Sequence, residues 1–421
     1  MVNKILKFLD IKHYNFYLIV SFFYLITILS FFLSLDPNGG ANLDYLNQKR
    51  ISQEFALSFL DEFLTFDQES TRHSPVLLII LSLLEKINLP DIYIRLIAFH
   101  FCMLLPFFFY KLINLRYNSI GKHNLLLLTC LIFLSPTFIS LSIWPDSRIY
   151  GVIFFTISLI YFSKFDLENK SNKLSNAIKC TFWYAIATYF SLNFALFSIF
   201  FIIKFFNFFK FDKKFIYLLS LNLILALPAL IYTLTLENIF FLKSGISGKE
   251  FNLKDNLNFA NKILMISSII FFYLIPFIFT KLIKIEFLNL KNAIISIFIV
   301  TACFIFFNYD SDYTGGGFFF KLSQLLFNNN ILFFIISILS IMVVLSLSRL
   351  NKYNALIVIL LILSNIQFSI YHKYYDPLLF ILFFSIFDIK LTNLKIKKIK
   401  FSYFYLFFII FLTLNYLKQI L

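Results

Sequence analysis

The chain has 421 residues, of which 60% are hydrophobic and 14% are charged, and its mean hydropathy is +0.83. Soluble domains contain about 45–50% apolar and about 25% charged residues, so this chain has too few charges to cover a soluble surface of its size. The composition excludes disordered, collagen-like and disulfide-scaffold proteins, and despite a net charge of +15 it excludes an ordinary nucleic-acid binder. Apolar stretches of about 20 residues recur along the whole length, which indicates a multi-pass membrane protein.

A basic segment precedes the first apolar run. Lys4, Lys7 and Lys12 come before residues 16–35, and no small-residue cleavage site follows that run. The run is too long for the core of a signal peptide. Because cytoplasmic ends of spans collect Lys and Arg, we predict an uncleaved first transmembrane helix with the N-terminus in the cytoplasm.

The segment 36–74 is the longest polar stretch and is predicted to lie outside. It holds seven acidic and three basic residues, a balance that suits the outer face. Residues 75–87 are apolar but too few to cross a membrane with ease. We therefore expect a helical first outer loop that ends in a juxtamembrane or re-entrant helix.

Further apolar runs predict an all-α fold with about 13 transmembrane helices. After residues 16–35, the predicted spans are 92–110, 124–141, 149–163, 177–192, 194–208, 215–235, 263–280, 293–308, 330–348, 354–370, 377–389 and 402–417. With this topology the predicted cytoplasmic segments have a charge of +18 and the rest of the chain −3. That asymmetry supports the predicted orientation, because cytoplasmic loops collect Lys and Arg. We expect a multi-pass protein of the bacterial inner membrane, with no separate soluble domain.

Four polar segments then fall at the outer face. They are residues 36–74, the turn Trp144–Arg148, residues 309–317 with three consecutive Gly, and Tyr371–Pro377. Each has an ordinary structural explanation: an exit turn, a helix cap, a flexible connector and an interfacial anchor. Together they favour a site, because the helix interiors are nearly free of charge. Transporters place functional polar residues near the midplane, whereas an enzyme acting on a lipid-borne group needs them at the rim.

The order of these segments resembles the GT-C superfamily of integral-membrane glycosyltransferases, which includes protein O-mannosyltransferases and aminoarabinose transferases. The stretch 71–78, Thr-Arg-His-Ser-Pro-Val-Leu-Leu, is similar to the His-Pro-Pro-Leu-Tyr stretch that follows their first loop. Residues 134–150 are similar to their third helix and the outer turn after it. The resemblance covers residues 1–165, a GT-C-like module with the first outer loop 36–74, and leaves 166–421 as a variable half.

The resemblance implies a polyprenyl-phosphate sugar donor, an acceptor that is a lipid, a glycan or a protein, inversion at the anomeric carbon and an outer-loop carboxylate as general base. We favour Asp44 as the base, with Asp36 second. The loop lacks the adjacent Asp-Glu pair of O-mannosyltransferases, which leaves the choice open. The leaving phosphate needs cationic donors, and the candidates are Arg72, His73 and Arg148.

Supporting roles are predicted for two more residues. Asp146 can orient Arg148 or share a divalent metal with the first-loop acids. Lys373 lies in Tyr371–Pro377, the last of the four polar segments, which we call the late outer segment. Tyr45, Trp144 and Tyr313 can stack on a sugar or belong to the aromatic belt.

Two other classes of function stay open. An O-antigen-type polysaccharide polymerase or a lipid-linked-glycan flippase has similar length and helix count, but polymerases usually carry a late outer loop with paired Arg. This chain places its largest outer loop first, and its late Arg349 is predicted inside. A non-catalytic membrane assembly factor is the other alternative.

Overall fold

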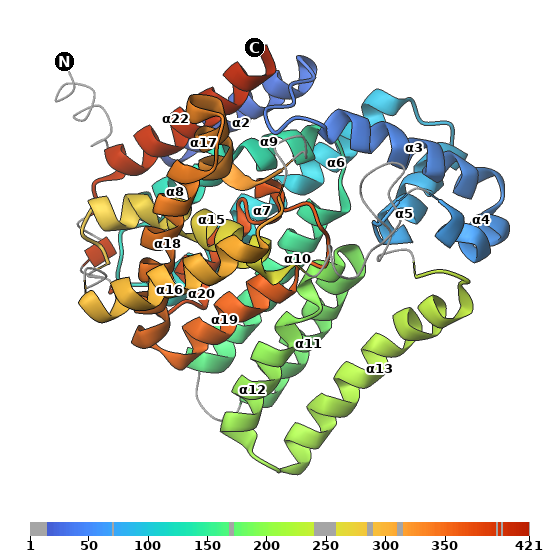
Figure 1. Cartoon of the computed structure of the whole chain (residues 1–421). Coiled ribbons are helices and arrows are strands. Elements are labelled where there is room, and N and C mark those ends of the chain that lie inside the picture. The colour runs from blue at the N-terminus through green and yellow to red at the C-terminus, as the bar shows by residue number, and fades with distance from the viewer. Residues whose placement is uncertain are drawn as a thin grey trace.

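A computed structural model of the chain is helical throughout the part it describes. The described residues are 15–69, 71–167, 172–239, 258–283, 289–309, 315–392, 395–396 and 399–420. These ranges contain no strand. Figure 1 shows a main bundle of packed helices, with α3, α4 and α5 on one side of it and α13 at an edge.

The helices of the first half are α2 (Asn15–Phe32), α3 (Ala41–Leu57), α4 (Phe59–Thr65), α5 (Pro75–Lys86), α6 (Asp91–Cys102), α7 (Leu104–Arg116), α8 (Lys122–Cys130), α9 (Pro136–Ile143) and α10 (Ser147–Leu167). Those of the second half are α11 (Lys173–Phe190), α12 (Phe197–Phe209), α13 (Lys213–Thr235), α15 (Phe259–Phe279), α16 (Leu290–Phe306), α17 (Gly317–Phe327), α18 (Ile331–Leu350), α19 (Lys352–Leu363), α20 (Leu378–Ser385) and α22 (Phe401–Ile420). Short 3-10 turns include η2 (Leu131–Leu134), η4 (Leu192–Phe194) and η6 (His372–Tyr374).

Six helices in the described part are long and apolar enough to cross a membrane, which supports a multi-pass membrane protein. They are Asp91–Arg116, Ser147–Leu167, Leu192–Phe209, Lys213–Thr235, Phe259–Phe279 and Ile331–Leu350. A seventh span is possible if Lys122–Leu134 and Pro136–Ile143, which meet at 66°, count as one.

The predicted count of about 13 spans is not confirmed. Where spans were predicted at 354–370 and 377–389, α19 has 12 residues and α20 has 8. At a rise of about 1.5 Å per residue these helices are about 18 and about 12 Å long, too short to cross a hydrocarbon core of about 30 Å individually. Every residue of α20 is buried, so its apolar sequence reflects packing inside the protein.

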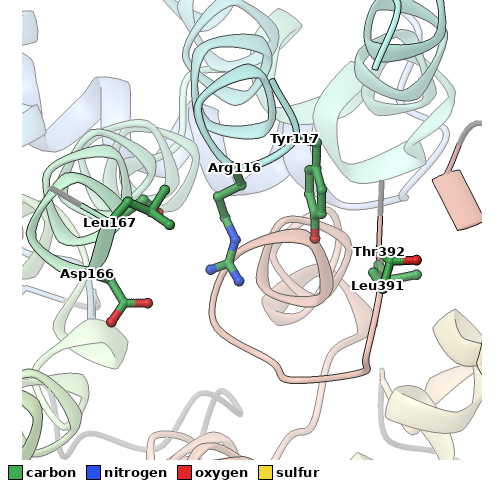
Figure 2. Close-up of a pocket in the computed structure, with 7 residues that line it drawn as sticks. Arg116, Tyr117, Asp166, Leu167, Leu391 and Thr392 are labelled. Carbon is green, nitrogen blue, oxygen red and sulfur yellow. The ribbon is translucent and has the colours of Figure 1, made fainter. Parts of the chain in front are cut away.

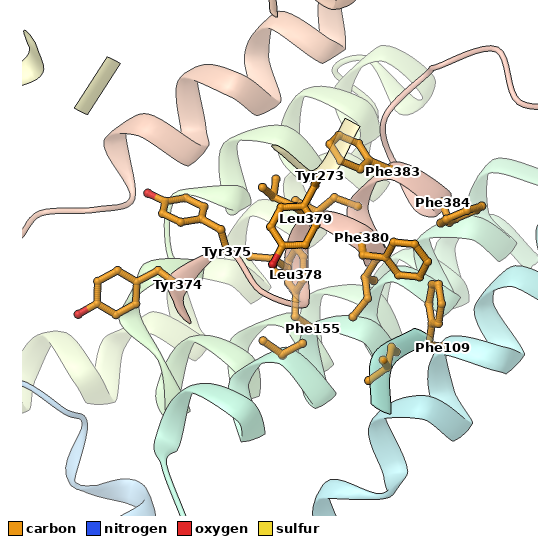
Figure 3. Packing of buried hydrophobic residues seen from close by; sticks show 14 of the residues in the cluster. Phe109, Phe155, Tyr273, Tyr374, Tyr375, Leu378, Leu379, Phe380, Phe383 and Phe384 are labelled. Atoms are coloured by element: carbon orange, nitrogen blue, oxygen red, sulfur yellow. The ribbon is translucent and has the colours of Figure 1, made fainter. Parts of the chain in front are cut away.

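A continuous aromatic core joins the two halves of the chain. Figure 3 shows Phe109 of α7 beside Phe380 and Phe384 of α20, and the ring centroids of Phe109 and Phe380 are 5.7 Å apart. The same view places Tyr374 and Tyr375 at the other end of α20. The burial of α20 therefore fixes the position of the late outer segment that precedes it.

The segment 36–74, predicted as the first outer loop, contains α3, α4 and the 3-10 turn η1 (Phe66–Gln68) and is therefore helical, as expected. α3 packs on α5, and a small separate core forms around Ile51, Phe55, Phe66, Leu78 and Leu236. α5 begins at Pro75, with the Ser74 hydroxyl accepting a hydrogen bond from the N–H of Val76 at 3.4 Å. This is the Ser-then-Pro start that a helix N-terminus favours.

Candidate functional site

Asp36 is a structural residue at the start of α3. Its Oδ1 accepts a hydrogen bond from the N–H of Gly39 at 3.1 Å, and its Oδ2 accepts from the N–H groups of Ala41 at 2.7 Å and Asn42 at 3.2 Å. Both carboxylate oxygens therefore stabilise the turn that begins the helix. Gly40 has a φ of +85°, a backbone conformation that suits glycine. The segment from Asp36 to Gly40 is therefore a turn, as its ordinary structural explanation suggested, and this turn determines where α3 begins.

Asp44, in the first turn of α3, forms an ion pair with Lys373 of η6. Oδ2 of Asp44 lies 2.6 Å from Nζ of Lys373. The Asp44 side chain is 41% exposed and the Lys373 side chain 9% exposed. Burial opposes the charge of Lys373, but the carboxylates of Asp44 and Asp146 outweigh burial, and the pKa of the ammonium group is raised. The pair thus joins the first outer loop to the late outer segment.

Asp146 is buried just before α10. Its Oδ1 accepts a hydrogen bond from the backbone N–H of Arg148 at 2.8 Å, whereas its Oδ2 has no hydrogen-bond partner in the described part of the chain. Burial alone would raise the pKa of Asp146, but the protonated form of His73 and the charges of Arg148 and Lys373 outweigh it, and the pKa is lowered. The capping explanation for this turn is therefore correct, and one carboxylate oxygen is left over.

His73 lies against the start of α10, with its Nδ1 2.9 Å from the hydroxyl oxygen of Ser147. Burial lowers the pKa of His73, and the neighbouring Asp146 only partly opposes that effect. We therefore treat His73 as a neutral hydrogen-bonding group near neutral pH, in place of the cation expected from the sequence.

The guanidinium group of Arg148 stacks on the ring of Tyr374, with Cζ 3.6 Å from the ring centroid. Arg148 is 7% exposed, and its Nε and Nη1 have no hydrogen-bond partner among the described residues. A buried guanidinium with unsatisfied N–H groups is costly unless an anion completes it. We call Asp44, His73, Asp146, Arg148 and Lys373 the outer cluster, and within it Arg148 is the strongest sign of a bound ligand.

A narrow cleft reaches this cluster. It is lined by Arg72, His73, Ser74, Ser147, Arg148, Phe190, Ser191, Leu192, Asn193, Ile366, Gln367 and Tyr374. The cleft encloses about 50 Å³, well below the roughly 300–1,000 Å³ of typical ligand pockets. A sugar phosphate therefore enters only if the walls of the cleft move apart.

The rim aromatics pack inward. Trp144 lies between Arg95, whose Cζ is 3.7 Å from the indole ring, and Tyr45, whose ring centroid is 5.9 Å away. Arg95 is 6% exposed and donates from Nε to the carbonyl of Ile143 at 3.1 Å, so it is held inside the protein. Tyr313 lies outside the described residues.

The glycine-rich segment supports the late outer segment. Residues 310–314 lie outside the described part, but Gly315 has a φ of +119°, and a Cβ there would lie 2.9 Å from the carbonyl oxygen of Ile370. The N–H of Gly316 donates to the same oxygen at 2.8 Å. Close backbone approach explains these glycines without a phosphate cradle.

The sequence analysis did not identify two residues of the candidate site, Tyr374 and Asp376. Tyr374 provides the ring under Arg148, and the buried Asp376 accepts hydrogen bonds from the Ser135 hydroxyl and, at 3.2 Å, from the N–H of Thr137. The Ser135-Pro136 and Asp376-Pro377 dipeptides were visible signals, but nothing in the sequence paired them.

The outer cluster does not suit a divalent cation. Among the described residues, no group of three His, Cys, Asp or Glu side chains could hold a metal ion. Asp44 is paired with Lys373, and Asp146 is surrounded by Arg148, His73 and Lys373, whereas Mg²⁺ and Ca²⁺ need several oxygen ligands.

Together the long apolar helices and the buried charges at one end of α10 define a multi-pass membrane protein with a candidate anion site. Comparison with protein-family models, curated proteins and solved structures gives no match.

Proposed function

We propose that the chain is a membrane glycosyltransferase of GT-C type, which transfers a sugar from a polyprenyl-phosphate donor to an acceptor hydroxyl at the outer face. One observation carries the proposal: a first-loop carboxylate, Asp44, lies in the same charged cluster as the unsatisfied guanidinium of Arg148. An inverting transfer needs an acceptor for a proton and a cationic site for a leaving phosphate close together.

The bond changes assign a role to each group. The acceptor oxygen attacks the anomeric carbon, the bond from that carbon to the phosphate oxygen breaks, and the lipid phosphate leaves with the electron pair. The acceptor proton passes to a carboxylate. Asp44 suits this role because its side chain is 41% exposed. Asp36 suits it less well, because backbone N–H groups engage both of its oxygens.

The phosphate-binding role falls mainly on Arg148, with Arg72 at the mouth of the same cleft. The planar guanidinium presents paired N–H donors to phosphate oxygens, and stacking on Tyr374 fixes its plane. His73 contributes a neutral hydrogen bond through the ring nitrogen that does not face Ser147. Lys373 holds Asp44 in place and adds positive charge to the cluster.

Transport is the weaker alternative. The cleft at Arg148 lies at the N-terminal end of α10, and a second polar cavity lies at the C-terminal end of the same helix. Between them α10 is packed in the apolar core, with Phe155 and Leu159 fully buried. A transporter places its binding site near the middle of the membrane instead.

The test is a transfer assay with the purified full-length protein and a panel of polyprenyl-phosphate sugars. Release of polyprenyl phosphate is measured for the wild type and for Asp44→Asn, with Glu54→Gln as the matched control on the exposed face of α3. Loss of a general base typically slows a reaction about 10²- to 10⁴-fold. If Asp44→Asn reacts as fast as the wild type, the base assignment is wrong. If no donor is consumed, the function itself is wrong.

A further inference from the structure

A second polar cavity lies at the opposite end of α10 from Arg148. It measures about 320 Å³ and is lined by Arg116, Tyr117, Ser163, Asp166, Leu167, Leu391 and Thr392. Figure 2 shows the side chains of Arg116, Tyr117 and Asp166 directed into the same space. An adjoining cavity of about 300 Å³ shares Arg116, Tyr117, Asp166 and Leu391 with it.

The two ends of α10 correspond to two faces of the membrane. Arg148 and Asp166 are 18 positions apart in one helix, which at about 1.5 Å per residue separates them by about 27 Å. This is close to the thickness of the hydrocarbon core, about 30 Å. The distribution of Lys and Arg predicts that the Asp166 end is cytoplasmic. The cavity therefore lies at the level of lipid headgroups, on the face opposite the proposed transferase site.

The cavity holds a cation and an anion that do not neutralise each other. In the described part of the chain, neither Arg116 nor Asp166 forms an ion pair within 4.0 Å. A purely structural pair would close the space between its members. Open space between a guanidinium and a carboxylate is instead complementary to a ligand that carries both charges.

A buried hydroxyl on the cavity wall supports a ligand independently. Ser163 is 1% exposed, and its hydroxyl oxygen has no hydrogen-bond partner among the described residues. A serine or threonine inside a helix can donate to the carbonyl four residues earlier, as Thr156 of the same helix does to Val152 at 2.7 Å. A polar atom that is buried at a cavity and unsatisfied there marks a place where a ligand can bind.

Two of the other charged side chains nearby have partners in the described part of the chain. Lys204 lies over the ring of Tyr353, with Nζ 3.6 Å from the centroid. Asp388 accepts a hydrogen bond from the Asn351 side chain at 3.0 Å. Arg116 and Asp166 are the two charged residues that line the larger cavity, and Arg116 also interacts with the hydroxyl of Tyr117 beside it.

We propose that this cavity binds the headgroup of a zwitterionic phospholipid of the phosphatidylethanolamine class. The guanidinium of Arg116 holds the phosphate, and the carboxylate of Asp166 accepts hydrogen bonds from the primary ammonium group. The Ser163 hydroxyl provides a third polar contact to the headgroup. A quaternary amine has no N–H to donate and is recognised by aromatic cages, so a choline headgroup fits less well. The volume is at the lower end of ligand pockets, which suits a headgroup.

The inference does not depend on the transferase proposal, and its test needs no activity. The melting temperature of the purified full-length protein in detergent is measured with added phosphatidylethanolamine, phosphatidylglycerol, phosphatidylcholine or soluble glycerophosphoethanolamine. We expect phosphatidylethanolamine to raise it by at least about 2 °C more than the other three do. Arg116→Gln and Asp166→Asn should each remove that difference. Lys164→Gln and Asp212→Asn, charge changes outside the cavity lining, should preserve it.

Several outcomes would overturn the proposal. An equal shift with phosphatidylglycerol would reduce the cavity to an anion site, and an equal shift with glycerophosphoethanolamine would reject a membrane lipid as the ligand. Unchanged selectivity in both cavity variants would also reject it. If Arg116→Gln fails to fold, Arg116→Lys keeps the charge but loses the paired donors, and it should weaken the selective shift.

Discussion

An ion pair at 2.6 Å joins Asp44 of the first outer loop to Lys373 of the late outer segment, 329 positions further along the chain. The two partners differ in exposure: the Lys373 side chain is 9% exposed and that of Asp44 is 41% exposed. Removing one partner therefore has a different consequence from removing the other, because only the buried charge is deprived of water.

We predict that Asp44→Ala destabilises the protein more than Lys373→Met does. The first change leaves a buried ammonium group without its closest counter-ion, at a cost of about 2 kcal/mol. The second leaves a carboxylate that water can reach, at a cost of less than about 1 kcal/mol. Melting temperatures in detergent compare the two. The double variant should be close to Lys373→Met alone, and a larger loss for Lys373→Met than for Asp44→Ala would contradict this account.

Asp36 should behave as a helix cap. Asp36→Ala removes the side-chain acceptors of the N–H groups of Gly39, Ala41 and Asn42, and loss of a cap costs about 0.5–2 kcal/mol. Asp36→Asn keeps one acceptor oxygen and should lose less. If transferase activity is present, its decline in both variants should follow the folded fraction. A large loss of kcat at unchanged melting temperature would instead indicate a direct catalytic role for Asp36.

The sequence predicted the local features of this cluster better than its contacts between distant segments. The Ser74-Pro75 start of α5 and the Asp146 cap are local features, encoded within a few residues. The pair of Asp44 with Lys373 depends on how distant segments pack, which no local pattern encodes. Asp36 could be read as a cap or a catalyst, because an acid before Gly-Gly suits both.

The span count exceeded what the structure supports because hydropathy does not separate lipid-facing helices from buried ones. α13 has only Leu218 buried, as a helix in lipid would, whereas α20 is even more apolar but has every residue buried in the protein. A charged residue can be buried in the same way: the ring of Trp144 and the carbonyl of Ile143 are the partners of Arg95 inside the protein.

Arg148 should control affinity for the lipid phosphate. Arg148→Lys keeps the positive charge but loses the planar donors and the stacking on Tyr374. A hydrogen bond to a charged group contributes about 1.5–3 kcal/mol, so we expect the dissociation constant for polyprenyl phosphate to rise at least about 10-fold. Tyr374→Phe is the control, since it preserves the ring while removing the hydroxyl that donates to Gln367. Equal affinity in Arg148→Lys and the wild type would exclude Arg148 from the phosphate site.

Two half-buried histidines, His73 and His372, should make the protein less stable as the pH falls. Burial lowers the pKa of His73, and it lowers the pKa of His372 to about 3. The unfolded chain binds these protons near the ordinary pKa of about 6.5, while the folded chain does not, so stability decreases from about pH 7.5 downward. Each group changes the free energy of unfolding by up to about 1.4 kcal/mol per pH unit below its unfolded pKa.

His73→Gln and His372→Gln should each flatten the dependence of the melting temperature on pH between about 7.5 and 5. His100→Gln, a change at an exposed position, should leave that dependence as steep as in the wild type. If neither His73→Gln nor His372→Gln alters the dependence of the melting temperature on pH, both histidines bind protons as easily in the folded protein as in the unfolded chain.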